Sequence, residues 1–411
     1  MNIGLMGFGT VGIGVYEILN LRQTNDKRIE RYKVAKILVR DINKKRNIAF
    51  EKTLLTDEPD DILEDASIDV VVCVMGGDEP EFSYIKKALS LGKHVVTANK
   101  QIVSEHISEL LELAKDNDVN FMFEASVGGG IPVISTITEL MRFNNVRRIQ
   151  GILNGTTNYI LTKITQEHRS FSDILIEAQR IGFAEADPSA DIEGYDISRK
   201  IQILSSIAFK HVIPQNEIHR RGISNITLED INMADSLGCN IKYIAQGIIH
   251  NNRYSISVTP VLIAKDQIIG NVNEEYNTIL LDCDILGTLC LTGKGAGKDA
   301  TANAIVSDII KATSLFNPYN SLRFKDAVSS SGLDGITNEY FVRIRLDGYE
   351  SLVKYLSIVE KYVHRNNFTV KQDMLFILTE EIRSEEMNSM YTELKDISGD
   401  VFYARIERKF L

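Results

Sequence analysis

The sequence lacks the features of membrane, secreted and nucleic-acid-binding proteins. No run of eighteen apolar residues occurs in its 411 residues, and no basic leader precedes the apolar segment after Met1, so we expect a cytoplasmic protein without a membrane partner. The net charge of −10 lacks the basic excess that phosphate binding needs, which argues against a nucleic-acid partner. The few cysteines match no paired metal motif, and we expect them to be reduced and structural. They are Cys73, Cys239, Cys283 and Cys290.

The length and the rhythm of apolar segments predict a multidomain α/β protein. A chain of 411 residues exceeds the roughly 250 to 300 residues that one hydrophobic core supports, so we expect two or three domains. Residues 1–130 alternate short apolar strands with helical patterns, which predicts a Rossmann-type, doubly wound parallel sheet. We expect the strands at 2–6, 33–39, 70–74, 95–96 and 120–123, and the helices at 11–21, 79–91 and 104–117.

The remaining chain predicts a central domain, a linker and a small third domain. Residues 131–316 are expected to form an α+β domain for catalysis and dimerisation, with residues 295–316 packing back on the first domain. Residues 317–339 are rich in serine, asparagine and glycine, as is typical of a linker. Residues 340–411 show the order β-α-β-β-α-β of a ferredoxin-like domain. In the central domain we expect helices at 133–141, 159–166, 172–181, 195–209 and 301–313, and strands at 147–153, 254–262 and 278–281.

The segment Gly7-Phe8-Gly9-Thr10-Val11-Gly12 predicts a dinucleotide site. It follows a predicted strand and opens a predicted helix, which is the context that the Gly-x-Gly-x-x-Gly motif requires. The first glycine makes the tight turn, the second lets the backbone approach the pyrophosphate, and the third permits close packing of helix on strand. The N–H groups at the helix start add partial positive charge.

The end of the second strand bears on the choice between NAD and NADP. A carboxylate there prefers the 2′-hydroxyl of NAD, whereas an arginine accepts the 2′-phosphate of NADP. The chain offers both, because Arg40 precedes Asp41 and three further cationic residues follow. The guanidinium of Arg40 suits a phosphate, so we favour NADP and keep NAD open.

Two further segments hold candidates for catalysis. Residues Gly182 to Lys200 place five carboxylates within twelve residues, and Asp196 and Lys200 share one face at a helix start because they lie four residues apart. This segment is either a solvated loop with a surface ion pair or a site for a ligand with an ammonium group. Lys100 ends a predicted strand, where open α/β sheets bind ligands, although an exposed loop lysine is the alternative.

Five segments, in this order, resemble homoserine dehydrogenase. They are Gly7 to Gly12, Val74 to Pro80, Thr97 to Lys100, Asn154 to Leu161 and Gly182 to Lys200. The resemblance covers residues 1 to about 330 and implies an NAD(P)-dependent oxidoreductase. Its substrates would be L-homoserine and L-aspartate 4-semialdehyde, in the pathway to threonine, methionine and isoleucine.

The resemblance also implies roles for individual residues. Lys200 would exchange a proton with the substrate oxygen while a hydride moves to or from the nicotinamide, and Lys100 would be the second catalytic lysine. Glu185 and Asp196 would hold the substrate amino group, with Asp191 in support. The cofactor-binding residues would be Gly7, Phe8, Gly9, Thr10, Val11, Gly12, Arg40, Gly76, Lys100, Gly182, Gly295 and Gly297.

The segment Glu124 to Pro132 resembles the family's loop for a monovalent cation. Glu124 and the backbone carbonyls of Val127, Gly129 and Ile131 would hold Na⁺, and hard cations prefer such oxygens. A glycine hinge between domains is the other interpretation, and both can hold together.

Two departures from the family pattern limit the resemblance. Ala300 stands before Thr301, where the family usually has a proline, so the helix there could start differently. The tail, residues 340–411, has the order of an ACT-type module, yet Arg345 to Glu350 lacks the Asp-x-Pro-Gly turn of an amino-acid site. We therefore expect the tail to be structural or to form a dimer or tetramer, and the missing turn argues against threonine feedback.

Two other functions compete with this interpretation. One is a catalytically inactive dinucleotide-binding sensor, which the presence of both Lys100 and Lys200 with carboxylate neighbours disfavours. The other is a dehydrogenase of another amino-acid semialdehyde. The acidic segment favours a substrate with an ammonium group but does not determine the length of its carbon chain.

Overall fold

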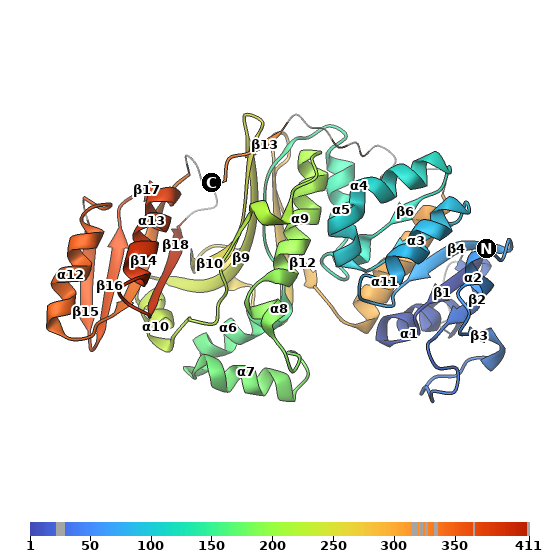
Figure 1. Ribbon diagram of the computed structural model, residues 1–411, viewed down its shortest axis with the longest axis horizontal. Helices are drawn as coiled ribbons and strands as arrows, with labels where there is room; N and C mark the ends of the chain where they lie inside the picture. Colours follow the sequence, from blue (N-terminus) through green and yellow to red (C-terminus); the bar gives the residue numbers. More distant parts are fainter. Residues whose placement is uncertain are drawn as a thin grey trace. The chain divides into compact units, whose positions relative to one another are not determined.

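The computed structural model describes residues 1–21, 29–314, 319, 322, 324, 328–332, 336–364 and 366–408. The chain forms two compact units, which are described separately below (Figure 1). The first unit comprises Met1–Val146, Gln202–Ile213 and Asp282–Ala327, and the second comprises Arg147–Ile201, Pro214–Leu281 and Val328–Leu411. Much of the predicted linker, residues 317–339, lies outside the described residues.

A six-stranded sheet forms the centre of the first unit. Its order is β3-β2-β1-β4-β5-β6, and its neighbouring strands pair in parallel. This order is that of the doubly wound dinucleotide-binding fold, so the predicted parallel sheet is confirmed. Ile3, Leu5, Val70 and Val72 on the two central strands are completely buried, as expected where both faces of a sheet are covered. The strands are β1 (Asn2–Met6), β2 (Lys33–Leu38), β3 (Leu55–Thr56), β4 (Ile68–Cys73), β5 (His94–Thr97) and β6 (Phe121–Met122).

The helices of the first unit alternate with these strands, and one comes from far along the chain. α1 is followed by a π-helical turn, Glu17–Leu21, and packs closely on α11. A Cβ at Gly14 would lie 2.9 Å from the Cβ of Ala302, so this glycine permits the close approach. The helices are α1 (Thr10–Tyr16), α2 (Asp60–Leu63), α3 (Glu81–Ser90), α4 (Lys100–Asp116), α5 (Val133–Leu140) and α11 (Lys298–Ala312), and strand β12 (Gly287–Lys294) precedes α11.

The second unit contains a mixed sheet built around a long hairpin. β9 and β10 pair antiparallel along twelve residues, from Cys239 opposite Ala264 to His250 opposite Arg253. The sheet order here is β11-β7-β9-β10-β18-β14-β16-β15, with the short strands β8 and β13 also on β10. The sequence analysis missed β8, β9, β12 and α10. The strands of the central part are β7 (Val146–Ile152), β8 (Ile218–Arg220), β9 (Cys239–His250), β10 (Arg253–Ala264), β11 (Tyr276–Cys283) and β13 (Ser329–Ser330).

The central helices carry the acidic segment. α9 (Tyr195–Phe209) has the predicted bounds, and Asp196 and Lys200 lie on its first turns. α10 begins with a capping box between Thr227 and Asp230, a signal that the sequence already contained. The other helices are α6 (Gly155–Glu167), α7 (Phe171–Arg180), α8 (Ser189–Ile192) and α10 (Leu228–Ser236).

The C-terminal module has the predicted order of strands and helices. Its strands lie in the order β18-β14-β16-β15, and β14 begins at Thr337, inside the predicted linker. β18 also pairs in parallel with β10, from Val261 opposite Arg405 to Ile263 opposite Glu407, so the module's sheet continues that of the central part. The elements are β14 (Thr337–Arg345), α12 (Tyr349–Val359), β15 (Asn366–Lys371), β16 (Met374–Thr379), β17 (Ile382–Arg383), α13 (Ser384–Lys395) and β18 (Val401–Glu407).

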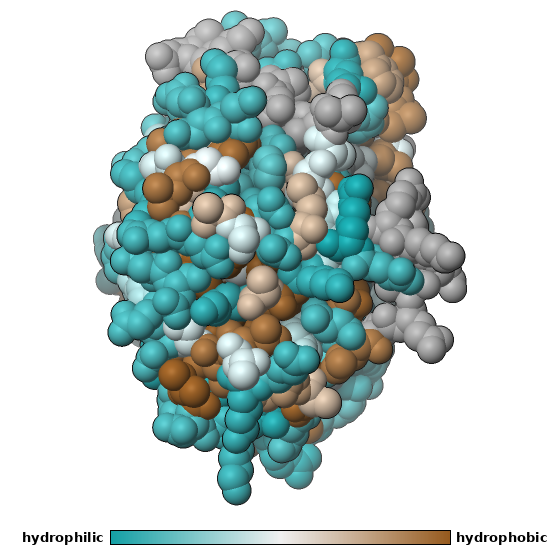
Figure 2. Space-filling view, turned by 90° about the vertical axis from the view of Figure 1, so that its right-hand side faces the viewer, coloured by the Kyte–Doolittle hydropathy of each residue, from teal (hydrophilic) through white to brown (hydrophobic). Residues whose placement is uncertain are grey.

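One face of the protein is mostly polar (Figure 2), and the cysteines of the described chain form no disulfide. The face drawn in Figure 2 is mostly hydrophilic, with apolar residues in small groups among polar ones. Among the described residues, no helix combines the length and the apolar character that a membrane crossing requires. All four cysteines are in the described part and none is in a disulfide, and Cys73, Cys239 and Cys283 are buried as structural thiols.

Candidate functional site

The glycine turn after β1 has the geometry that a dinucleotide requires. Gly7 has a φ of +106°, and a Cβ there would lie 2.7 Å from the carbonyl oxygen of Val74. A Cβ at Gly12 would lie 2.1 Å from the oxygen of Gly7, so the third glycine is equally required. A Cβ at Gly9 would have no described residue within 4 Å, which leaves space in front of the N–H groups at the start of α1. The turn therefore fits a pyrophosphate.

Arg40 and Phe8 flank this turn. Arg40 follows β2, at the carboxyl end of a parallel strand, and is exposed. The Arg46 guanidinium donates to the carbonyl oxygens of Lys44 at 2.9 Å and Asp41 at 3.2 Å, and lies 5.7 Å from the ring centre of Phe8. The Asp41 carboxylate accepts a bond from a nearby backbone N–H at 2.8 Å. The Asp41 carboxylate thus stabilises its own turn, while Arg40 is exposed to solvent.

A buried carboxylate that the sequence analysis missed holds the loop after β4. Glu81, the first residue of α3, is fully buried, and its Oε2 accepts hydrogen bonds from the N–H groups of Met75 and Gly76, both at 2.8 Å. Its Oε1 accepts a bond from the Thr97 hydroxyl at 3.2 Å. Burial raises the pKa of Glu81, although these donors oppose the shift. The available signal was its place on the apolar stripe of α3, where it is buried together with Ile85, Ala88 and Leu89.

Asn99 joins the same loop to the start of α4. Its Oδ1 caps the helix by accepting from the N–H groups of Gln101 at 3.1 Å and Ile102 at 3.2 Å, and its Nδ2 donates to the carbonyl of Gly77 at 2.5 Å. The helix therefore begins at Lys100, and its predicted start at Ser104 was wrong because the cap was overlooked. Lys100 is partly buried on the first turn, so one side chain orders both the glycine loop and this lysine.

In the second unit, Asn154 gathers the acidic residues and Lys200. Its Nδ2 donates to Asp191 Oδ1 at 2.7 Å and to Asp196 Oδ2 at 2.9 Å, while its Oδ1 caps α6 through the N–H of Thr157. Lys200 Nζ lies 2.8 Å from Asp196 Oδ2 and donates to the carbonyl of Leu153 at 2.7 Å. The surface ion pair considered for Asp196 and Lys200 is wrong, because these residues are only 6% and 8% exposed. Burial, and then the charge of Asp196, raise the pKa of Asp191.

The other predicted residues of this segment lie at its edge. Gly194 has a φ of +79°, and a Cβ there would lie 2.1 Å from the Tyr243 hydroxyl, so glycine is required just before Asp196. Glu185 is exposed, and within the described chain its side chain has no hydrogen bond to the Asn154 cluster. Gly182, at a φ of +82°, ends α7 and is also exposed.

Glu124 is buried in the first unit and binds the start of α5. Its Oε1 accepts from the N–H of Ile134 at 2.7 Å, and its Oε2 accepts from the N–H of Ser135 at 2.9 Å and from the Ser135 hydroxyl. The N–H of Glu124 donates to Asp308 Oδ2 at 2.7 Å. Burial, together with the nearby charge of Glu124, raises the pKa of Asp308 to about 8. Lys311 Nζ lies 3.7 Å from Glu124.

The loop that follows packs on the late glycine segment. Val127 and Ile131 are buried, and Gly129 has a φ of +54°. A Cβ at Gly129 would lie 2.6 Å from the carbonyl oxygen of Gly295, so these two backbones are in close contact. Gly297, at a φ of +112°, precedes the first residue of α11. α11 starts three residues earlier than predicted, and Ala300 lies in its first turn.

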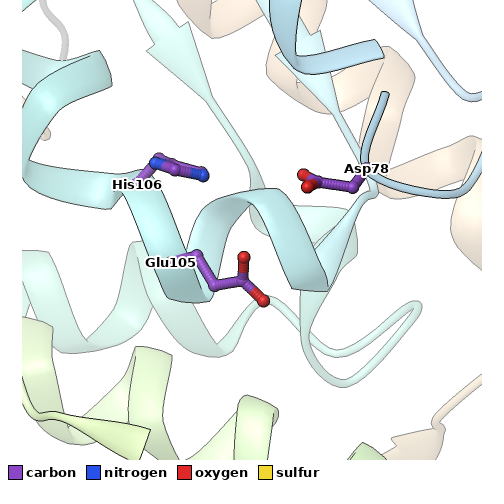
Figure 3. Close-up of side chains that lie close together, drawn as sticks. All are labelled: Asp78, Glu105 and His106. Carbon is purple, nitrogen blue, oxygen red and sulfur yellow. The ribbon is translucent and has the colours of Figure 1, made fainter. Parts of the chain in front are cut away.

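One other group of side chains could hold a metal. In the described part of the chain, Asp78, Glu105 and His106 place ligand atoms within 4.8 Å of one another. Figure 3 shows the imidazole of His106 and the carboxylate of Asp78 pointing toward each other, with Glu105 on the same helix as His106. Glu105 is exposed, and His106 also stacks on Phe82 at 3.9 Å between ring centres. This group lies apart from the loop of Glu124 and was not predicted.

Comparison with known proteins identifies the family. Residues 7–124 match the model described as "Homoserine dehydrogenase, NAD binding domain", and residues 132–310 match that of "Homoserine dehydrogenase". A homoserine dehydrogenase of Pseudomonas aeruginosa is 33% identical over 99% of both chains. The crystal structure of one from Thiobacillus denitrificans has a TM-score of 0.88 at 31% identity, covering 99% of this chain and 98% of that one.

A hyperthermophilic archaeal homoserine dehydrogenase, solved in complex with NADPH, has a TM-score of 0.64 at 29% identity. It covers 77% of this chain and 98% of its own. These matches support the enzyme over an inactive sensor or a dehydrogenase of another semialdehyde. The chain belongs to the homoserine dehydrogenase family, NAD(P)-dependent oxidoreductases that interconvert L-homoserine and L-aspartate 4-semialdehyde.

Proposed function

We propose that Lys200 exchanges the proton of the reaction. In the direction of aldehyde reduction, its ammonium donates a proton to the carbonyl oxygen as a hydride reaches the carbon, and in the reverse direction its amine accepts the hydroxyl proton. The carbonyl of Leu153 and the carboxylate of Asp196 take up two of its three N–H groups, so the third is directed to the substrate oxygen. This buried and oriented ammonium is the observation that carries the proposal. Lys100, ordered by the cap at Asn99, takes the second catalytic role.

We further propose that Asp191 and Asp196, with Glu185, bind the substrate ammonium. Buried Asp196 and partly buried Asp191 have Lys200 as their cationic partner, so the cluster carries one excess negative charge. Burial, and then the charge of Asp196, raise the pKa of Asp191, and a bound ammonium would favour its ionised form. Exposed Glu185 would reach the amino group from the edge of the cluster.

The cofactor is proposed to lie on the turn of Gly7, Phe8, Gly9, Thr10, Val11 and Gly12, with Gly76, Lys100, Gly182, Gly295 and Gly297 contributing. Bound NAD(P) supplies a nicotinamide that accepts or donates the hydride. The open space at Gly9 supports the assignment. We propose a preference for NADP because exposed Arg40 is available for a 2′-phosphate, and NADPH is the cofactor of the archaeal relative.

A monovalent cation, Na⁺, is proposed in the loop of Glu124, Val127, Gly129 and Ile131. The Glu124 carboxylate is engaged by α5, so we assign the contacts to backbone carbonyls, with the carboxylate supplying negative charge nearby. The positive φ of Gly129 turns this backbone back on itself and supports a loop of inward carbonyls.

The domain organisation is proposed to follow the sequence prediction, with parts at 1–130, 131–316, 317–339 and 340–411, except that the last part begins with β14 at Thr337. The module order β18-β14-β16-β15 supports an ACT-type tail with a structural role. A homodimer through the mixed sheet, or a tetramer through this module, and a cytoplasmic location complete the proposal.

The role of Lys200 is tested with Lys200→Met, with Lys265→Met, an exposed lysine of the second unit, as the control. Reduced nicotinamide is followed by absorbance with L-homoserine and NADP or NAD. We expect kcat to fall by about two decades or more in the first variant, the scale of a lost general acid/base, and to stay unchanged in the second. Cofactor binding, measured by nicotinamide fluorescence, should persist in both. A fall of less than tenfold in a folded Lys200→Met protein would disprove the role.

The NADP preference is tested with Arg40→Ala. We expect KM for NADPH to rise about tenfold while KM for NADH stays within twofold, because only NADPH carries the 2′-phosphate. An unchanged ratio of kcat/KM for the two cofactors would show that Arg40 does not contact this phosphate.

A further inference from the structure

A small polar cavity of about 50 Å³ lies inside the second unit, where the central sheet meets the C-terminal module. β8 and β10 form one side, and β14, α13 and β18 form the other. Its volume is that of a few water molecules. The described residues that line the cavity include two arginines and no aspartate or glutamate.

Arg221 carries a charge into this cavity without an acidic partner. Its guanidinium stacks 3.3 Å from the ring centre of Tyr403 and donates to the Tyr403 carbonyl at 2.8 Å. Its Nε is buried and, in the described structure, has no hydrogen-bond partner. Burial lowers the pKa of Arg221, and no described carboxylate lies within ion-pair distance of it. Arg221 as a residue is partly buried, and a guanidinium with a buried Nε is costly unless a counter-charge accompanies it.

Glu407, the carboxylate that pairs with the lining residue Arg405, is shared by two arginines. Glu407 lies 3.0 Å from Arg148 and 2.9 Å from Arg405, and Arg405 also donates to Gln246 at 2.9 Å. Of the two arginines that line the cavity, Arg405 thus has a carboxylate partner and Arg221 has none in the described structure. The described lining of the cavity therefore lacks a negative charge to balance Arg221.

The rest of the lining supplies hydrogen-bond donors. Ser255, Ser257 and Thr259 occupy alternate positions on β10, so their hydroxyls lie on one face of the strand, the face that lines the cavity. His219 adds an imidazole, and burial together with Arg221 lowers its pKa to about 4, so it is neutral at pH 7 and donates one N–H. Hydroxyl and N–H donors around a guanidinium are a suitable environment for an anion.

We propose that this cavity binds a small monovalent anion, of the size of chloride, which neutralises Arg221 and joins the C-terminal module to β10. A water molecule could accept the same hydrogen bonds but would leave the charge uncompensated. The site is independent of the proposed catalytic residues.

The test measures thermal stability of the full-length enzyme at constant sodium concentration and ionic strength, with gluconate exchanged for chloride, bromide, formate or acetate. Gluconate is too large for the cavity. We expect Tm to stay flat at low chloride and then to rise with the logarithm of its concentration, as binding to the folded state alone requires. The rise should vanish in Arg221→Gln and persist in Arg383→Gln, an exposed arginine of the same module. A response to formate and acetate but not to halides would identify a small carboxylate as the anion.

Equal responses in wild type and Arg221→Gln would overturn the proposal. If Arg221→Gln does not fold, Ser257→Val, which fills the cavity from β10, should lose the chloride response in the same way. Crystals grown in bromide should show an anomalous peak beside Arg221. Water alone in that density, or a bromide peak without any effect on Tm, would also refute the site as a structural one.

Discussion

Removing the carboxylate of Glu81 tests how the cofactor loop is held. Glu81 is not expected to touch the cofactor, yet it accepts the N–H groups of Met75 and Gly76, in the loop where we propose a cofactor contact at Gly76. Glu81→Ala removes both bonds. Glu81→Gln keeps one carbonyl oxygen for them, and its amide can donate to the hydroxyl of Thr97, which already donates to the Cys73 carbonyl at 3.0 Å.

The burial and the hydrogen bonds of Glu81 determine how much each substitution should destabilise the protein. An unsatisfied buried donor costs about 1 to 3 kcal/mol, and the lower end applies here because Gly76 is exposed and water can reach the loop. Two lost bonds and the space left by a fully buried side chain give a destabilisation of about 2 to 4 kcal/mol for Glu81→Ala. We expect about 1 kcal/mol for Glu81→Gln, which retains an acceptor. Because 1.4 kcal/mol corresponds to a factor of ten, a loosened loop should raise KM for NAD(P)H about tenfold in the alanine variant.

The assay combines urea unfolding with initial rates at varied cofactor and saturating substrate. Glu109→Ala is the control, since that carboxylate pairs with Lys86 on the surface, where both side chains are over 40% exposed and the pair is worth less than about 1 kcal/mol. KM for the amino-acid substrate should stay within twofold in every variant. A Glu81→Ala protein with unchanged stability and unchanged cofactor KM would refute the reasoning, as would equal losses in the alanine and glutamine variants.

Two further predictions concern the other clusters. Asn154→Ala removes a helix cap and the donor between Asp191 and Asp196, so we expect the free energy of unfolding to fall by about 1 to 2 kcal/mol. KM for L-homoserine should rise at least tenfold, while KM for the cofactor stays unchanged. Equal rises in both KM values would contradict the assignment of this cluster to the substrate. Asp308 has a pKa of about 8 when folded and a lower value when unfolded, so the folded state holds an extra proton and wild-type stability should fall as pH rises from about 4 to 8. Asp308→Asn removes this titrating group, so the Tm of the variant minus that of wild type should increase from about pH 4 to pH 8 in a series of thermal melts. A Tm difference that stays constant with pH would show that Asp308 is ionised throughout.

Local patterns predicted much of the fold because they act over a few residues. The glycine turn at Gly7 to Gly12, the parallel strands and α9 were recognised from the spacing of glycines and apolar residues alone. Helix starts were less well placed, because Asn99 and Gly297 act through backbone bonds that precede the apolar stripe. The strand β9 was missed since it is buried along most of its length and so lacks the alternation of a half-exposed strand.

The sequence by itself determined the residue types for the proposed chemistry: glycines for a pyrophosphate, two lysines as candidates for proton exchange and carboxylates as candidates to bind an ammonium. Tertiary structure decided which of these groups are buried and bonded together. It made Asp196 and Lys200 a buried pair, engaged Glu124 at the start of α5, and brought Arg221 to β18 from 182 residues away. The reason is physical: turns and helix faces depend on neighbours in the chain, whereas burial and charge balance depend on neighbours in space.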